Sequence, residues 1–324
     1  MDKVKKILKL VILLLCIVYI IKYFYSNWDS LRVTFKISRI AIAFILVVSV
    51  TSLLTIAYRF KIIMHKCSSI NPPFWKWFRV IMMAKFYNLF FAPSGNIYRA
   101  IELKRKFNIS YTDYVSASVS FTWMDLILDL IFSEIVILSV KPDLMFGNVK
   151  ASQFVVLLVA IFICLPILAN FLLKKIPLRA AALVWVKSKL SEVMSATLNN
   201  IRDTSYLCKV IIWGILFTIQ TVTVYYLLFD SFQIKLDIPS IFLFYSLLKI
   251  STAFIITPGN IGIQEIAFGF LSSQIGGSMA TGILVSTVCR VLGTAIIIII
   301  AVIMGGTGLI QTKNIISEMK NDKA

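Results

Sequence analysis

The chain has 324 residues, of which 59% are hydrophobic and 15% are charged. That proportion excludes a soluble globular protein, whose water-facing surface has to be largely polar, so lipid is the expected outer solvent. The net charge of +18 does not indicate nucleic-acid binding, because the basic residues are spread through loops beside apolar runs. Anionic lipid head groups are the expected partner of these residues.

Six apolar runs are long enough to cross a membrane. A hydrocarbon core roughly 30 Å thick requires about 20 helical residues. Helices are the expected form, since a spanning segment has to pair its backbone groups internally and these runs lack the alternation of a barrel strand. The runs cover residues 7–25, 40–58, 115–140, 153–173, 207–229 and 281–304. The first is expected to be a retained helix, because no small-residue cleavage pattern follows it.

The distribution of lysine and arginine indicates an orientation. With the N-terminus inside, most of the 33 basic residues fall in inner segments, including 59–79, 99–106 and 174–202, which assigns Arg59 to an inner loop. The positive-inside rule therefore predicts a multi-pass protein of the cell (inner) membrane with both termini cytoplasmic.

Two further apolar regions are broken by proline and glycine. The first, residues 78–91, runs into Pro93, Gly95 and Asn96 and is too short to cross and return. The second, residues 238–256, breaks at Pro258, Gly259, Asn260 and Gly262 and resumes over residues 264–274. We interpret both as re-entrant hairpins, with a proline kink or a surface loop as the alternative. Because irregular backbone at membrane depth has to be covered by protein or line a wet cavity, the breaks predict an internal cavity.

The two breaks share a weak internal repeat. Gly95 to Ile97 and Gly259 to Ile261 both read Gly, Asn, Ile, and an acid follows each, Glu102 and Glu265. The orientation has the first hairpin entering from the cytoplasm and the second from outside. The expected fold is therefore an all-α membrane bundle of about six spanning helices plus two re-entrant hairpins in an inverted repeat. It forms a single domain over residues 1–324, with halves at about 1–175 and 205–310.

The breaks resemble those of the transmembrane region of lysylphosphatidylglycerol synthases and of related stand-alone flippase-like proteins. One mark is a proline, glycine and acid-type break with a following arginine and leucine, here Pro93, Gly95, Asn96, Arg99 and Leu103. The second is the segment Pro258, Gly259, Asn260, Ile261, Gly262, Ile263, Gln264, Glu265, completed by the helix arginine Arg290. The chain departs from the pattern at Asn96, Gln264, Phe121 and Thr122. The resemblance implies movement of a lipid between leaflets and, without the soluble aminoacyl-transfer domain of the synthases, no lipid synthesis.

Arg99 and Arg290 are the best candidates for binding an anionic head group, since a guanidinium matches phosphate oxygens and stays charged when desolvated. The alternative for Arg99 is an ordinary inner-loop residue. Arg290 lies inside an apolar run, where a charge costs about 3 kcal/mol or more without a partner. Glu265 is the expected partner, and a purely structural ion pair between the two is the alternative.

Asp125 and Asp129 are four residues apart, so they share one helical face, as a proton relay or a cation site requires. Asp129 and Glu134 are expected to be hydrated near the outer interface, which leaves Asp125 as the candidate. A proton gradient acting through Asp125 or Glu265 is a candidate driving force. The predicted site is completed by the residues of the two breaks: Gly95, Asn96, Pro258, Gly259, Asn260 and Gly262.

The leading hypothesis is a flippase that moves an anionic phospholipid or a lipid-linked envelope precursor through a cavity between the hairpins. The alternatives are an integral-membrane transferase of envelope polysaccharide synthesis and a regulatory lipid-binding partner. We predict no cofactor, metal site or catalytic residue. Candidate protein partners are a second copy of the chain or an envelope synthase.

Overall fold

The computed structural model describes residues 38–90, 94–175, 203–253, 260 and 262–305. These residues form nine α-helices and one short β-hairpin, which confirms the all-α class. Five helices occupy five of the predicted membrane runs: α3 (Arg39–Ser68), α6 (Tyr111–Val140), α7 (Ala151–Lys175), α9 (Thr204–Ser231) and α12 (Met279–Gly305). The strands β1 (Met145–Phe146) and β2 (Val149–Lys150) connect α6 to α7. The run at residues 7–25 lies outside the described residues.

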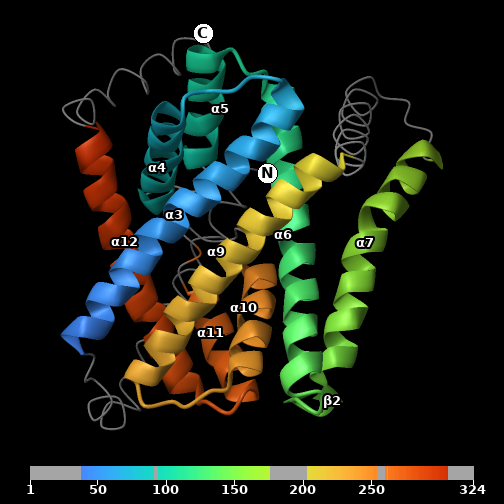
Figure 1. The fold of residues 1–324 in the computed structure, drawn as a ribbon, viewed down its shortest axis with the longest axis vertical. Coiled ribbons are helices and arrows are strands. Elements are labelled where there is room, and N and C mark those ends of the chain that lie inside the picture. The colour runs from blue at the N-terminus through green and yellow to red at the C-terminus, as the bar shows by residue number, and fades with distance from the viewer. Residues whose placement is uncertain (1–37, 91–93, 176–202, 254–259, 261, 306–324) are drawn as a thin grey trace, which may run out of the picture.

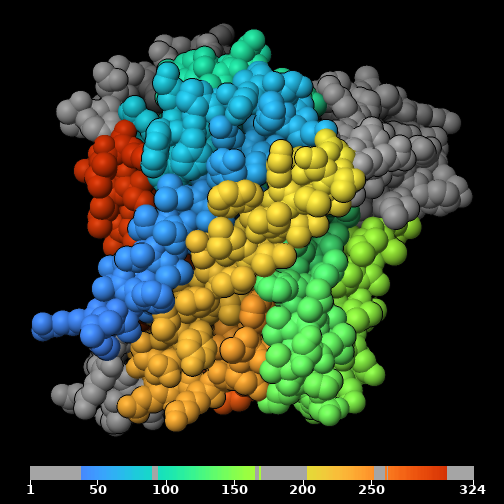
Figure 2. Space-filling view, viewed as in Figure 1, coloured from blue at the N-terminus to red at the C-terminus, as the bar shows by residue number. Residues whose placement is uncertain are grey.

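Three of the described helices, α3, α9 and α12, are long and apolar enough to cross a bilayer. Helix α6 also has 30 residues, but it carries several acidic side chains. Helices α3 and α9 lie side by side across one face of the molecule (Figure 2). Large apolar side chains such as Ile161 on α7 and Ile303 on α12 are exposed, as expected where lipid surrounds the bundle.

Two pairs of shorter helices lie between the long ones. Helices α4 (Phe74–Phe90) and α5 (Ser94–Phe107) form one hairpin, and α10 (Ile238–Ala253) and α11 (Ile263–Gln274) form the other. They contain 17, 14, 16 and 12 residues, fewer than the about 20 needed for a full crossing. Figure 1 shows that the hairpins enter from opposite ends: α4 and α5 from the end where α3 finishes, α10 and α11 from the end where α9 finishes.

Gly95 brings α4 and α5 into close contact. A Cβ atom at this position would lie 1.9 Å from the Ala84 carbonyl oxygen of α4 and 2.6 Å from the Asn88 side chain. The Gly95 N–H donates to Asn88 Oδ1 at 2.8 Å. The glycine of the first break therefore has a packing role, because any side chain would push the two helices apart.

The second hairpin uses its glycine differently. Gly262 precedes α11 with a φ of 88°, in the left-handed region that side chains disfavour. Its N–H donates to Glu265 Oε2 at 2.6 Å. The acid predicted from the repeat therefore satisfies a free backbone donor at the start of α11.

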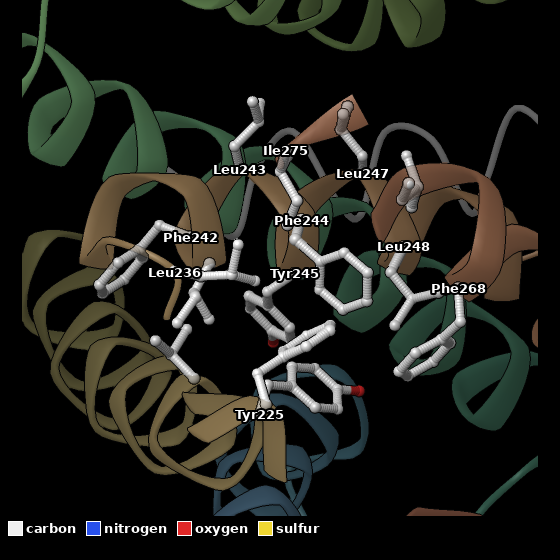
Figure 3. Close-up of a cluster of buried hydrophobic side chains, with 14 of the residues drawn as sticks. Tyr225, Leu236, Phe242, Leu243, Phe244, Tyr245, Leu247, Leu248, Phe268 and Ile275 are labelled. Carbon is white, nitrogen blue, oxygen red and sulfur yellow. The ribbon is translucent and has the colours of Figure 1, made fainter. Parts of the chain in front are cut away.

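Each hairpin has its own apolar core. Around α10 and α11, the rings of Tyr225, Phe244 and Phe268 pack edge to face with centroids 5.1 to 5.7 Å apart (Figure 3). Around α4 and α5, Phe60 of α3 packs against Trp77, whose indole N–H donates to a backbone carbonyl of α3 at 2.8 Å. Both hairpins are therefore fixed to long helices by buried aromatic side chains.

Gly95→Ala should destabilise the protein by about 1–3 kcal/mol, because the added methyl group meets backbone that cannot move aside. Gly293→Ala on α12 is the matched control, since its Cβ would point into open space. Thermal unfolding of the purified full chain in detergent, followed by tryptophan fluorescence, compares the two. Equal melting temperatures would contradict the close α4–α5 contact.

Candidate functional site

Four charged side chains from three helices meet inside the bundle. Arg59 on α3 and Lys249 on α10 both form ion pairs with Asp125 on α6, and Lys249 also pairs with Asp129, one turn further along α6. The distance from Lys249 Nζ to Asp125 Oδ2 is 2.5 Å. We call these four residues the charge quartet. The expectation that the two aspartates share one face is confirmed, because a single lysine reaches both.

The charge quartet is buried and its charges cancel. Arg59 is 0% exposed, Asp129 1% and Asp125 4%. The Lys249 side chain is more accessible, at 17%. A lone charge in such surroundings would cost several kcal/mol, whereas two cations and two carboxylates compensate one another. The quartet therefore fixes α3, α6 and α10 relative to one another.

Asp129 has further polar partners. The hydroxyl of Thr218 on α9 donates to Oδ1, and that of Tyr245 on α10 donates to Oδ2 at 3.2 Å. The Tyr245 hydroxyl also accepts from Lys249 Nζ at 3.0 Å. The prediction that Asp129 is hydrated near an interface was wrong, because α10 packs against α6 and covers this carboxylate.

Arg59 lies within α3, so its assignment to an inner loop was also wrong. One guanidinium nitrogen, Nη1, donates to Asp125. The other two, Nε and Nη2, have no hydrogen-bond partner among the described residues although they are buried. Gly214 of α9 makes room for the group, since a Cβ there would lie 3.0 Å from Arg59 Cζ. The Phe121 ring, with its centroid 5.4 Å from Cζ, covers the guanidinium.

A cavity of about 480 Å³ adjoins the charge quartet. Residues of α3, both helices of the first hairpin, α6 and α10 of the second hairpin line it. The sequence predicted an internal cavity; this one is partly open, and the second hairpin contributes one described residue to it, Lys249. Its polar lining residues are Lys85, Asn96, Arg99, Tyr114, Ser118, Thr122, Asp125 and Lys249.

Arg99 is held in place on one side of this cavity. Its Nε donates to the Tyr114 hydroxyl and its Nη2 to Asn96 Oδ1, both at 2.9 Å. The guanidinium carbon lies 5.0 Å from the Phe60 ring centroid and 5.3 Å from that of Tyr114. These are neutral partners. The positive charge of Arg99 is therefore oriented without being neutralised.

Lys85 of α4 adds a second cation to the same cavity. Within the described residues its amino group has no hydrogen-bond or ion-pair partner. The nearby acid of α5, Glu102, is instead paired with Arg105 and Lys106 on its own helix. Lys85 and Arg99 together give the cavity two basic side chains, and neither is paired with a carboxylate of the described chain.

Arg290 and Glu265 form a second cluster, where α11 packs against α12. Arg290 Nε donates to Glu265 Oε1 at 2.5 Å, which confirms the expected partner. The Nη2 of Arg290 donates to Gln264 Oε1 at 3.1 Å and to the Asn260 carbonyl at 3.4 Å. This cluster fastens the start of α11 to α12, and its side chains are not among the described residues that line the cavity.

The predicted site residues thus divide into two groups. Asn96, Arg99 and Asp125 line the cavity, whereas Asn260, Gly262, Glu265 and Arg290 belong to the second cluster. Gly95 lies in the α4–α5 contact, and Pro258 and Gly259 lie outside the described residues. Sequence reasoning missed Lys85, Lys249 and Arg59 as site residues. The one available signal was that each of these cations interrupts an apolar stretch.

Comparison with known proteins gives one family. The model of the lysylphosphatidylglycerol synthase TM region matches residues 6–301. No curated protein and no solved structure gives a significant match to the chain. Among the described residues, no group of three or more His, Cys, Asp or Glu side chains could hold a metal ion.

Asp125→Asn should lower the free energy of unfolding by about 3–5 kcal/mol, because it leaves Arg59 buried without a counter-charge. The matched control is Asp143→Asn. Asp143 also pairs with a lysine, Lys150, but it lies at the surface with 86% of its side chain exposed, so the change should cost less than about 1 kcal/mol. Thermal unfolding in detergent measures both variants. If both variants lose equally little stability, the charge quartet does not hold the helices together.

Proposed function

Because the chain belongs to the family of lysylphosphatidylglycerol synthase transmembrane regions, we propose that it moves a lipid with an anionic head group between the two leaflets of the membrane. It is a multi-pass membrane protein, and its family associates it with phospholipids. The observation that carries the proposal is the pair of uncompensated cations, Lys85 and Arg99, in one cavity.

The chemistry of this pair suits a phosphate group. A guanidinium offers two parallel donors to phosphate oxygens, and the lysine ammonium adds a compact charge beside it. Asn96 and Tyr114 hold the Arg99 side chain before a ligand arrives, so little conformational freedom remains to be lost on binding. A monoanionic or dianionic head group would neutralise charges that are otherwise expensive at membrane depth.

The size of the cavity supports a head group rather than a whole lipid. A volume of about 480 Å³ lies within the range of small-molecule sites and is too small for two acyl chains in addition. The lipid tails therefore stay in the bilayer while the head group crosses through the protein.

The hairpins supply the route between leaflets. We interpret them as re-entrant elements of an inverted repeat, entering the membrane from the two sides with both chain termini in the cytoplasm. In transporters, such an arrangement places a binding site near the midplane and lets the two halves open alternately. Arg290 of α12, held by Glu265 of the second hairpin, receives the head group in the state that opens to the other side. The accessibility of Arg290 supports this role, since 26% of its side chain is exposed.

Lys85→Gln and Arg99→Gln should each slow leaflet exchange of fluorescent phosphatidylglycerol in proteoliposomes by about tenfold or more, because each removes a charged hydrogen bond worth about 1.5–3 kcal/mol. Lys150→Gln is the control, a surface lysine in the β-hairpin away from the cavity, and should exchange lipid like the wild type. Wild-type protein that exchanges no anionic lipid, but forms a product from a donor sugar, would replace the flippase proposal by a transferase.

Arg290→Ala tests the second cluster separately. If Arg290 receives the head group, the variant loses exchange while keeping its fold, whereas a purely structural ion pair predicts a lower melting temperature and normal exchange per folded molecule. Glu265→Gln, which keeps a hydrogen-bond acceptor for the Gly262 N–H, serves as the companion variant. Thermal unfolding is measured on the same preparations as the exchange.

A further inference from the structure

We propose that Asp129 is a proton-binding site, which takes up a proton when an anionic head group in the cavity draws Lys249 away from it. The inference rests on the proposed function, because it requires an anion in the cavity. It adds a second ligand, the proton, and a fixed stoichiometry between the proton and the lipid.

Lys249 belongs to two sites at once. Its ammonium bridges Asp125 and Asp129, and its side chain also lines the cavity that contains Lys85 and Arg99. It is the most accessible member of the charge quartet, and it stands on a flexible four-carbon stem. An anion bound beside Arg99 therefore competes with the carboxylates for the same ammonium group.

Charge balance then singles out Asp129. The quartet is neutral with Lys249 in place, and removing that cation leaves two carboxylates against Arg59 alone. Because Arg59 contacts Asp125 and not Asp129, Asp129 is left without a cation. A buried carboxylate beside another carboxylate favours its neutral form, so one proton on Asp129 restores neutrality.

The surroundings of Asp129 suit both protonation states. Facing it are Asp125 on its own helix, the Thr218 hydroxyl on α9, and Lys249 and the Tyr245 hydroxyl on α10. Hydroxyl groups both donate and accept. They bond the charged carboxylate as donors, and one of them turns to accept from the protonated acid.

Arg59 offers Asp125 a replacement for Lys249. In the structure Asp125 gives one oxygen to each cation, while the Nε and Nη2 atoms of Arg59 are buried without a hydrogen-bond partner. When Lys249 leaves, Oδ2 of Asp125 is free to accept from one of these nitrogens. Arg59 and Asp125 then form the bidentate pair that arginine prefers. These two nitrogens of Arg59 are therefore explained as donors to Asp125 in a second arrangement of the charge quartet, the one without Lys249.

The test is isothermal titration calorimetry of the full chain in detergent with dihexanoyl phosphatidylglycerol. At each of several pH values, the titration is done in two buffers of different ionisation enthalpy. The wild type should take up about one proton per bound lipid, and its affinity should fall by up to about tenfold per pH unit as the pH rises. Asp129→Asn, which imitates the neutral acid, should bind with no proton uptake and no pH dependence. Asp143→Asn should take up protons like the wild type.

The outcomes separate the two proposals. Lipid binding by the wild type with no proton uptake, or unchanged uptake by Asp129→Asn, overturns the proton site and leaves the flippase proposal standing. No binding of phosphatidylglycerol by the folded wild type overturns both. Because the wild-type measurement needs no substitution, a variant that fails to fold does not remove the test.

Discussion

Arg59, Asp125, Asp129 and Lys249 cancel one another's charges inside the bundle, and the placement of three helices depends on that cancellation. Apolar packing alone does little to determine how helices are arranged in lipid, since lipid tails are as apolar as the leucine and isoleucine side chains of the helices. A buried charge is different, because its cost is removed only where the fold brings an opposite charge to it. Helix α10 has 16 residues, too few to cross the membrane and be oriented by it. The ion pairs of Lys249 with Asp125 and Asp129 orient it instead. The same ion pairs place α10 beside the cavity.

The ends of the short helices pose a second constraint, since backbone donors inside a membrane bundle find no water. In both hairpins a side chain accepts a hydrogen bond from the glycine N–H at the turn: Asn88 from Gly95 and Glu265 from Gly262. The two solutions differ in detail, because Asn88 belongs to the helix before the turn and Glu265 to the helix after it. Glu265 carries a charge and therefore needs Arg290, which ties α11 to α12. The second cluster thus has a structural reason to exist whether or not it also meets a lipid.

Sequence reasoning found the long helices because a run of apolar residues is a local property, and it found the hairpins because proline and glycine mark the breaks. Arg99, Asn96 and Asp125, which line the cavity, were predicted as site residues for similarly local reasons. Arg59 was missed, because the positive-inside rule assigns a basic residue at the end of an apolar run to a loop, whereas α3 continues through Phe60, Ile62, Ile63 and Met64. The pairings of Arg59 and Lys249 with the two aspartates join distant parts of the chain. A single sequence contains no signal for such contacts, which is also why the burial of Asp129 was not foreseen.

The basic residues of the interior therefore fall into two classes that composition cannot distinguish. Arg59 and Lys249 face carboxylates and are neutralised within the protein. Lys85 and Arg99 face a cavity, and the described chain offers them neutral partners or none. Neither cation is needed for the packing of these helices, since a glutamine would fit at either position at lower cost. Both cations are accounted for if the missing negative charge arrives with a ligand, which is the role that the proposed function gives to a lipid phosphate.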